Sequence, residues 1–199
     1  VSDIGIDFLN NFTNFYLRFD GKKAKFFING ASRHSPLNAA LSVAAAIYCG
    51  CPLSNIKKRL KFIDLPERRL AISNSLKGSI LIDDSYNSNP ASLKNAVDSL
   101  EGLKRKKVCI LGDMKELGSD SQKIHQEMYE YISERVDQIF CIGDEWSTCS
   151  PNEKKDLSIF ENQDDLYSHL ISIIDKKTIL LVKGSRSTRM DLLADKLKE

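Results

Sequence analysis

The residues best suited to chemistry lie in short polar segments that each follow an apolar run. Residues 83–90 combine two adjacent carboxylates with an aromatic ring and two amides. Neighbouring side chains on a strand point to opposite faces, so Asp83 and Asp84 make a poor chelating pair and we expect them to have separate roles. A carboxylate here suits a pair of ribose hydroxyls and Tyr86 suits stacking on a base. A polar turn that ends in a helix cap explains the same residues.

A second polar segment, residues 111–118, is bracketed by glycines. Gly permits the tight backbone path of such a loop, and Asp113 and Glu116 are acceptors for an ammonium group or for an Arg of a neighbouring domain. A structural turn is an equally good interpretation. Residues 143–146 predict only a turn.

The last polar segment, residues 182–189, supplies Lys183, Ser185 and Arg186 between an expected strand and an expected helix. Cations and hydroxyls beside a Gly suit an anion at a helix N-terminus, although a solvated basic turn has the same composition. The order Gly-x-x-x-x-Gly-Lys-Ser/Thr is absent from the whole sequence, so no Walker A loop is present in it.

Three further residues suit either a binding site or a structural role. Asn38 stands at the entrance of an Ala-rich stretch, where its amide can cap a helix or bond an adenine edge. Arg68 stands in the segment Pro66-Glu67-Arg68-Arg69 at an expected domain junction, where an Arg of the segment can reach a nucleotide phosphate. His125 has no Cys, His or paired carboxylate around it at metal-ligand spacing, so the sequence predicts no metal site and favours a structural histidine.

Alternating strands and helices must position these segments. The sequence predicts strands at 79–83, 107–111, 138–142, 157–160 and 178–182, and helices at 90–103, 120–135, 163–174 and from 187 onward. This order predicts an α/β fold, a Rossmann-like and mostly parallel sheet with helices on both faces. Ligands of such sheets bind beyond the carboxyl ends of the strands, where the polar segments fall.

The first third of the chain follows a different pattern. Residues 12–19 and 24–28 predict a β-hairpin, an Ala-rich stretch at 38–49 predicts a closely packed helix, and Ser54 begins a short amphipathic helix. Asp64-Leu-Pro66 interrupts the pattern. We therefore expect a domain boundary near residue 65, which separates residues 1–64 from residues 65–199.

Composition excludes several classes of protein. With 29 Lys and Arg against 27 Asp and Glu, the net charge of +2 gives no signal for a nucleic-acid partner, and no apolar run approaches the roughly 20 residues of a membrane span. Five cysteines cannot all pair within the chain, and Cys49-Gly50-Cys51 has the wrong spacing for a redox or zinc motif. We expect reduced thiols and a cytoplasmic location. The start at Val1, without an initiator Met or signal peptide, suggests a fragment.

Taken together and in order, these segments resemble the Mur ligase family, and within it the type that adds D-alanyl-D-alanine to UDP-N-acetylmuramoyl-tripeptide. The resemblance covers essentially the whole chain. The motifs that carry it are His34-x-x-x-Asn38-Ala-Ala, Leu65-Pro66-x-Arg68, Ile82-Asp83-Asp84-Ser85-Tyr86-Asn87-x-Asn89-Pro90, Leu111-Gly112-Asp113-Met114-x-Glu116-Leu117-Gly118 with His125, and Lys183-Gly184-Ser185-Arg186.

The resemblance implies a three-domain bacterial enzyme in which a UDP-binding domain and a P-loop ATPase domain precede the C-terminal domain. Residues 1–64 would be the tail of the ATPase domain, and residues 65–199 the domain that closes over ATP. The implied ATP contacts are Asn38 to adenine, Arg68 to phosphate, Asp84 to ribose, and Tyr86 and Asn87 along the nucleotide edge. The implied lining of the substrate cleft is Asp113, Glu116, Lys183, Ser185 and Arg186.

In this family ATP phosphorylates the tripeptide carboxylate, and the amine of D-alanyl-D-alanine then attacks and expels phosphate. Mg²⁺ and cations stabilise the transferring phosphoryl group. This sequence lacks the phosphate-loop Lys, the acidic magnesium ligand and the UDP domain, so we expect the chain alone to be inactive and to contain no catalytic residue of its own. Met190-Asp191 stands where the family usually has Met-Glu.

Two other functions are compatible with the same architecture. One is a non-enzymatic module that binds a nucleotide or a peptide. The other is a ligase resembling folylpolyglutamate synthetase, against which the loop Asp84-Ser-Tyr-Asn argues because that family has a different sequence after the strand-end Asp.

Overall fold

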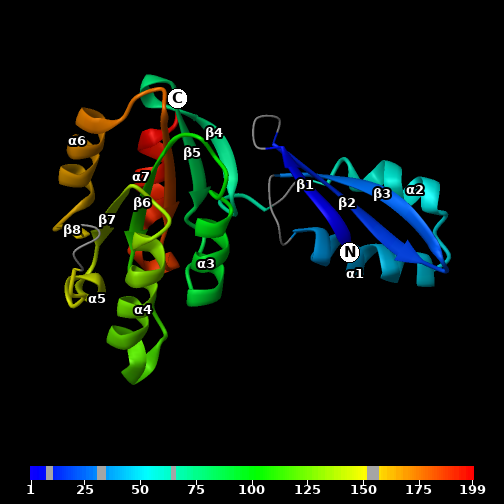
Figure 1. Ribbon diagram of the computed structural model, residues 1–199, viewed down its shortest axis with the longest axis horizontal. Coiled ribbons are helices and arrows are strands. Elements are labelled where there is room, and N and C mark those ends of the chain that lie inside the picture. Colours follow the sequence, from blue (N-terminus) through cyan, green and yellow to red (C-terminus); the bar gives the residue numbers. More distant parts are fainter. Residues whose placement is uncertain (8–10, 31–34, 64–65, 152–156) are drawn as a thin grey trace. The chain divides into compact units, whose positions relative to one another are not determined.

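The computed structural model describes residues 1–7, 11–30, 35–63, 66–151 and 157–199. The chain divides into two compact units, Val1–Pro66 and Glu67–Glu199 (Figure 1). Residues 64 and 65, at which we expected the domain boundary, lie outside the described residues, as does His34 of the first family motif.

The first unit has a three-stranded antiparallel sheet in the order β1-β2-β3. The predicted hairpin is confirmed, because β2 pairs with β3 around Asp20 and Gly21, which both have positive φ as a tight hairpin turn requires. Side chains of β2, β3 and both helices share one core. The elements of this unit are β1 (Ser2–Asp7), β2 (Phe12–Phe19), β3 (Lys22–Asn29), α1 (Ser35–Tyr48) and α2 (Leu53–Leu60).

The second unit is built on a six-stranded sheet in the order β4-β5-β9-β6-β7-β8. All neighbouring pairs are parallel except β4 with β5, which are antiparallel. The predicted mostly parallel sheet is therefore confirmed. Its strands are β4 (Ala71–Ser75), β5 (Ser79–Asp84), β6 (Lys106–Gly112), β7 (Gln138–Ile142), β8 (Leu157–Phe160) and β9 (Thr178–Lys183).

Helices cover both faces of this sheet (Figure 1). One face carries α6 and α7, whose apolar side chains pack on Leu81, Leu180 and Val182. Side chains alternate along a strand, so Ile179 and Leu181 face the other side, where α3 and α4 pack together. The helices are α3 (Pro90–Asp98), α4 (Ser121–Ser133), α5 (Asp144–Ser147), α6 (Gln163–Ile173) and α7 (Met190–Leu197), with 3₁₀ turns at Leu76–Gly78, Gly118–Asp120 and Arg186–Thr188.

The chain reverses its direction across the sheet at β9. It passes from β5 to β6, β7 and β8 and then returns through α6 to place β9 between β5 and β6. Right-handed crossovers that run in opposite directions put their helices on opposite faces. The carboxyl ends of β5, β9 and β6 therefore lie at a switch point of the topology, the place where open α/β sheets bind ligands.

Several details differ from the sequence prediction. The strands β1 and β4 were not predicted, because Ser2–Asp7 and Ala71–Ser75 are short and mostly polar and gain their strand conformation by pairing with β2 and β5. The helix expected to reach residue 103 ends at Asp98, and the expected turn after β7 contains the one-turn helix α5. No helix in the described part of the chain is long and apolar enough to cross a membrane.

Candidate functional site

Asp83 and Asp84 have separate roles because they lie on opposite faces of the sheet. Asp83 pairs in register with Val182, whose side chain packs toward α6 and α7, whereas Asp84 pairs with Lys183 on the other face. The carboxylate of Asp83 accepts hydrogen bonds from the backbone N–H and the hydroxyl of Ser85, at 3.1 and 2.5 Å. Asp83 therefore fixes the start of the loop that follows β5.

Asp84 forms a buried ion pair with Lys183. Lys183 Nζ lies 2.5 Å from Asp84 Oδ2 and 2.8 Å from the carbonyl oxygen of Asn87, and the Lys183 side chain is only 2% exposed. The other carboxylate oxygen of Asp84 accepts the backbone N–H of Leu70 at 3.0 Å. This lysine thus fastens the end of β5 and its loop to the end of β9.

Burial disfavours both charges of this pair. Removal from water raises the pKa of Asp84 above its ordinary value, and the charge and hydrogen bond of Lys183 oppose that rise. Burial lowers the pKa of Lys183, with Asp84 opposing the change and the charge of Arg69 adding to it.

Arg69 is presented by a strained and well-anchored segment. Its neighbours Arg68 and Leu70 both have positive φ, 58° and 54°, a conformation that persists only when surrounding contacts hold it. The carbonyl of Arg68 accepts the backbone N–H of Tyr86 at 3.1 Å, and Leu70 is bonded to Asp84. As a result the Arg69 guanidinium lies 4.5 Å from the centre of the Tyr86 ring, which is 45% exposed.

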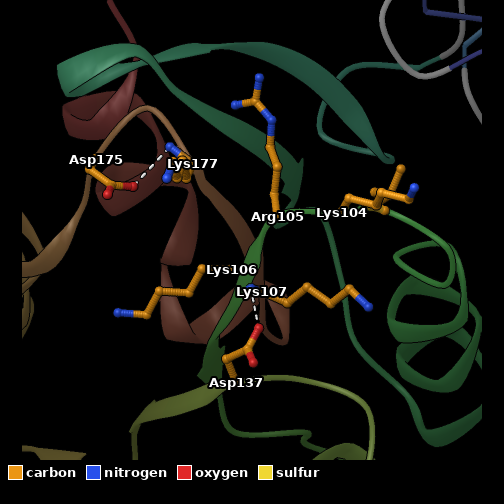
Figure 2. A pocket seen from close by; sticks show the side chains of 8 residues that line it. Lys104, Arg105, Lys106, Lys107, Asp137, Asp175 and Lys177 are labelled. Atoms are coloured by element: carbon orange, nitrogen blue, oxygen red, sulfur yellow. Dashed lines mark hydrogen bonds between the residues drawn. The ribbon is translucent and has the colours of Figure 1, made fainter.

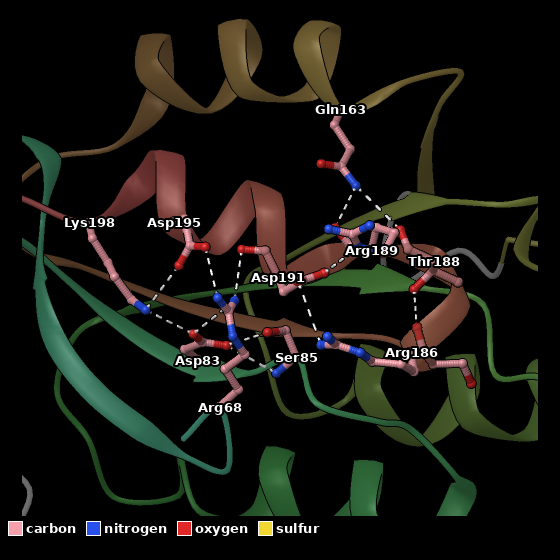
Figure 3. A network of polar contacts seen from close by, with 11 residues as sticks. Arg68, Asp83, Ser85, Gln163, Arg186, Thr188, Arg189, Asp191, Asp195 and Lys198 are labelled. Atoms are coloured by element: carbon pink, nitrogen blue, oxygen red, sulfur yellow. Dashed lines mark hydrogen bonds and ion pairs between the residues drawn. The ribbon is translucent and has the colours of Figure 1, made fainter. Parts of the chain in front are cut away.

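Arg68 points instead into a network around α7 (Figure 3). Its guanidinium donates to the carbonyl of Asp191 at 3.0 Å and to the carboxylate of Asp195 at 2.8 Å. Asp83 lies 4.0 Å away, and Lys198 bonds both Asp83 and Asp195. Arg68 therefore ties the segment before β4 to the last helix.

A second cluster joins the loops after β6 and β9. Ser185 Oγ accepts the backbone N–H of Lys115 at 2.8 Å and donates to the carbonyl of Ser88 at 3.3 Å, so one hydroxyl links three strand-end loops. Asp113 is 3% exposed and bonds Lys115 Nζ at 2.9 Å, which raises the pKa of that lysine. The carbonyl of Asp113 accepts the N–H of Ser185.

Glycines allow these loops to approach one another closely. A Cβ on Gly112 or Gly184 would lie 2.5 or 2.6 Å from Thr188 Oγ1, so the turn after β9 can pack on the strand ends only when both residues lack a side chain. Gly143 has φ 131°, and a Cβ there would overlap Asp113 Oδ1. These contacts fix the position of the Asp113 carboxylate.

His125 has a structural role, as the sequence favoured. Its side chain is fully buried in α4, where Nε2 accepts the backbone N–H of Met114 at 3.1 Å and Nδ1 lies 2.8 Å from the carbonyl of Ser121. These two bonds require a neutral ring with its proton on Nδ1. The ring also packs edge-on against Trp146. His125 therefore holds the 113–118 loop in place.

The structure brings together only part of the expected set of residues. Asp84, Asn87 and Lys183 form one cluster, and Asp113 and Ser185 form the adjoining one. Glu116 is exposed with φ 66°, and Arg186 turns to Asp191, 3.6 Å away. Asn38 is exposed on α1 of the first unit.

The sequence did not single out Lys115, and it offered Arg69 only as the neighbour of Arg68 at the expected domain junction. Arg69 follows Arg68 directly, and two adjacent cations before a strand are a signal that either side chain can serve a site. Lys115 occupies the unspecified position of the Gly-Asp-Met-x-Glu motif, two residues after Asp113.

The buried thiols are poorly suited to nucleophilic chemistry. Burial raises the pKa of Cys109 to about 12 and that of Cys149 to about 11, so both remain protonated near neutral pH. Among the described residues, no group of three or more His, Cys, Asp and Glu side chains has an arrangement that could hold a metal ion.

The first cluster has the chemistry to bind a nucleotide. Each Asp84 oxygen accepts one described hydrogen bond and can accept a second, which suits a ribose diol. The exposed Tyr86 ring offers a stacking surface, and within the described residues the exposed Arg69 has no ion-pair partner. The residues present therefore fit a phosphorylated nucleoside.

This fold and its polar edge define a doubly wound α/β ligand-binding domain. The sequence profile of the Mur ligase glutamate ligase domain matches residues 68–186. The chain belongs to the Mur ligase family.

Individual relatives agree with this assignment. The chain is 32% identical to the UDP-N-acetylmuramoyl-tripeptide–D-alanyl-D-alanine ligase of Haemophilus influenzae, over 83% of the chain and 37% of that protein. The crystal structure of MurF from Acinetobacter baumannii matches with a TM-score of 0.85 and 29% identity, over 98% of the chain and 44% of that protein. MurF of Thermotoga maritima, solved in complex with ADP, has the same fold, with a TM-score of 0.84, 21% identity and the same two coverages. The chain thus spans about two fifths of its relatives' length.

Proposed function

We propose that this chain is the C-terminal part of an ATP-dependent ligase that joins D-alanyl-D-alanine to UDP-N-acetylmuramoyl-tripeptide. The observation that carries the proposal is the cluster of Asp84, Lys183, Tyr86 and Arg69 at the switch point of the sheet. Its chemistry suits the nucleotide that a ligase of this family requires. The substrate assignment is supported by the named relatives, which the chain matches across both of its units.

In this proposal Asp84 binds the ribose hydroxyls, and Tyr86 and Asn87 line the nucleotide. Arg69 supplies the cation for the phosphates, because its guanidinium is exposed beside Tyr86. Arg68, which bonds α7, holds the segment that presents Arg69. The phosphate loop and the Mg²⁺ ligands belong to a preceding ATPase domain outside this chain.

In this proposal the second cluster, Asp113, Lys115 and Ser185, acts in the second half of the reaction. After ATP has phosphorylated the tripeptide carboxylate, the amine of D-alanyl-D-alanine attacks the acyl carbon and phosphate leaves. Lys115, Ser185 and Arg186 are the groups suited to the carboxylate of the incoming dipeptide, and Glu116 is suited to its ammonium group. Ser185 also links this cluster to the nucleotide loop through Ser88.

The first unit is proposed to be the end of that ATPase domain. One side of α1 is apolar yet exposed, with exposed fractions of 61% for Leu37, 67% for Leu41 and 93% for Tyr48. These positions recur at helical spacing and form a continuous stripe that a larger domain would cover. Asn38, next to this stripe, is the proposed adenine contact.

The test is a ligase assay on the full-length protein that contains this chain. Phosphate release should require both the tripeptide precursor and D-alanyl-D-alanine. Arg69→Ala and Asp84→Asn should each raise the KM for ATP by roughly tenfold or more, as expected when a charge-assisted hydrogen bond is lost. Lys123→Ala, an exposed position on α4 outside both clusters, is the control and should leave the KM unchanged.

Two results would count against this function. ATP turnover that does not depend on D-alanyl-D-alanine would contradict the substrate assignment, and unchanged kinetics in both variants would contradict the nucleotide site. The 199-residue chain alone should show no dipeptide-dependent turnover, because it lacks a phosphate loop.

A further inference from the structure

The nucleotide cluster consists of Asp84, Lys183, Tyr86 and Arg69. A strongly basic pocket lies at the opposite ends of the strands of the same sheet. It is formed where β6 and β9 begin, and the seven residues of β6 place it about 20 Å from the carboxyl end of that strand. The pocket is open and has a volume of about 730 Å³. Its lining is Leu103, Lys104, Arg105, Lys106, Lys107, Asp137, Asp175 and Lys177 (Figure 2).

Backbone contacts hold the two loops of this pocket together. The N–H of Lys106 donates to the carbonyl of Lys177 at 2.9 Å, and Arg105 Nη1 donates to the carbonyl of Lys176 at 2.7 Å. The carboxylates also bond backbone groups: Asp137, just before β7, accepts the N–H of Lys107 at 2.7 Å, and Asp175 accepts the N–H of Lys177 within its own turn at 2.8 Å. The pocket is thus part of the folded sheet edge.

The cations of the pocket are not neutralised by ion pairs. Five cations and two carboxylates line it, an excess of positive charge greater than the net +2 of the whole chain. Within the described residues no ion pair joins any of the five to an acid, whereas Lys23, Lys123 and Lys196 elsewhere are all paired. Like charges held together repel, so a bound anion would stabilise the folded state.

The shape of the pocket selects among anionic ligands. Since β6 and β9 are both interior strands, neither offers a free edge to which an acidic peptide could add as a strand. No aromatic side chain lines the pocket, so bases of a nucleic acid would have nothing to stack on. The volume of the pocket is that of a small-molecule site.

We propose that this pocket binds a small molecule with two or more linked phosphate groups. Figure 2 shows the side chains of Lys104, Arg105, Lys106 and Lys107 spreading in different directions from the start of β6. A single phosphate would meet only part of this set, whereas a chain of phosphates can contact several cations at once. The site is separate from the nucleotide cluster and does not depend on the proposed ligase function.

Calorimetric titration of the 199-residue chain with tripolyphosphate tests the proposal. The expected result is saturable one-to-one binding to the unmodified chain. The affinity of Lys104→Gln/Lys107→Gln for tripolyphosphate should be lower by about tenfold or more. The control Lys94→Gln/Lys123→Gln removes two exposed lysines from α3 and α4 and should bind as the unmodified chain does. Arg69→Ala should also leave the affinity unchanged, which separates this pocket from the nucleotide cluster.

Thermal unfolding supplies a second measurement that does not rely on binding heats. Tripolyphosphate should raise the Tm of the unmodified chain and not that of Lys104→Gln/Lys107→Gln, while an equal concentration of monophosphate at matched ionic strength should have a smaller effect. Absence of saturable binding, equal weakening in the control variant, or loss of binding in Arg69→Ala would each overturn the proposal. So would binding to vesicles of anionic phospholipid in place of tripolyphosphate.

Discussion

Lys183 Nζ lies 2.5 Å from Asp84 Oδ2, where two neighbouring parallel strands end. The two residues are 99 positions apart in the chain, and each is almost entirely removed from solvent. A single ion pair therefore joins the carboxyl ends of β5 and β9, where the nucleotide is proposed to bind. It also holds the Asp84 carboxylate in one orientation.

Removing one partner of this ion pair should lower the free energy of unfolding. Lys183→Met leaves the Asp84 carboxylate buried without its cation, and the free energy of unfolding of the chain should fall by about 3 kcal/mol. Lys183→Met/Asp84→Asn removes both charges and should be more stable than the single variant. Urea unfolding of Lys183→Met, Asp84→Asn and the double variant completes a double-mutant cycle. If the stability losses of the two single variants simply add up in the double variant, a direct interaction is contradicted.

The same variant should acquire a pH dependence. Burial already raises the pKa of Asp84 in the folded state, and loss of Lys183 removes the main opposing influence and leaves only the Leu70 hydrogen bond against it, so this pKa rises further. A raised folded-state pKa means that the folded chain binds the proton more tightly than the unfolded chain. The stability of Lys183→Met should therefore decrease as pH rises above about 4, the ordinary pKa of Asp, until the folded-state pKa is passed.

The hydroxyl of Ser185 is predicted to stabilise the junction of three loops. Ser185→Ala removes the acceptor for Lys115 N–H and should lower the free energy of unfolding by about 1 to 2 kcal/mol. Ser187→Ala is the matched control, because Ser187 is exposed two positions away and should change stability by less than about 0.5 kcal/mol. Equal effects in the two variants would show that the Ser185 hydroxyl is not important for stability.

Gly143→Ala should displace Asp113. The new Cβ would overlap a carboxylate that cannot easily move, and φ 131° already excludes ordinary side chains. We expect a loss of at least about 2 kcal/mol in urea unfolding. Gly102→Ala isolates the backbone part of this effect, since Gly102 has φ 78° but no atom within 4 Å of the place that a new methyl group would take, and it should cost about 1 kcal/mol.

Arg68 should contribute stability in a pH-dependent way. Its hydrogen bond lowers the pKa of Asp195, with Lys198 assisting, so this contribution is complete above the ordinary Asp pKa near 4 and is lost as pH falls through the lowered value. The difference in unfolding free energy between the unmodified chain and Arg68→Met should therefore shrink between about pH 5 and about pH 3. Arg69→Met, which removes no described ion pair, should show no such change.

The thiols should divide into two classes. Cys49 and Cys51 are exposed, whereas Cys109, Cys141 and Cys149 are buried, with pKa values raised by that burial. A thiol reagent at neutral pH should therefore titrate two groups rapidly in the folded chain and all five after unfolding in urea. Rapid reaction of a third thiol would indicate that one of the buried cysteines is accessible.

The strands and helices of the second unit were predictable because their apolar patterns are local. The strands at Gln138–Ile142 and Leu157–Phe160 have the predicted limits, and Asn89 caps α3 as its sequence indicates, accepting the N–H of Ser92 at 2.8 Å. The strand β4 was missed because its conformation depends on a partner, β5, more than on its own residues. Tertiary pairing can impose strand structure on residues of weak propensity.

The sequence by itself determined which residues would gather at one edge of the sheet. Alternation of strands and helices places strand ends together, so the order of the elements predicted that the segments containing Asp84, Asp113, Lys183 and Ser185 would lie near one another. It also determined that Asp83 and Asp84 would face opposite ways, since side chains alternate along a strand.

Only the tertiary structure decided which of those residues contact one another and where their side chains point. Insertion of β9 between β5 and β6 is a long-range event that no local pattern encodes, and it pairs Lys183 with Asp84 and brings Ser185 to Ser88 and Lys115. The left-handed conformations at Arg68 and Leu70 turned one arginine toward α7 and its neighbour toward Tyr86. Such conformations are stable only because the surrounding contacts hold them, so adjacent arginines with equal local chemistry acquired different roles.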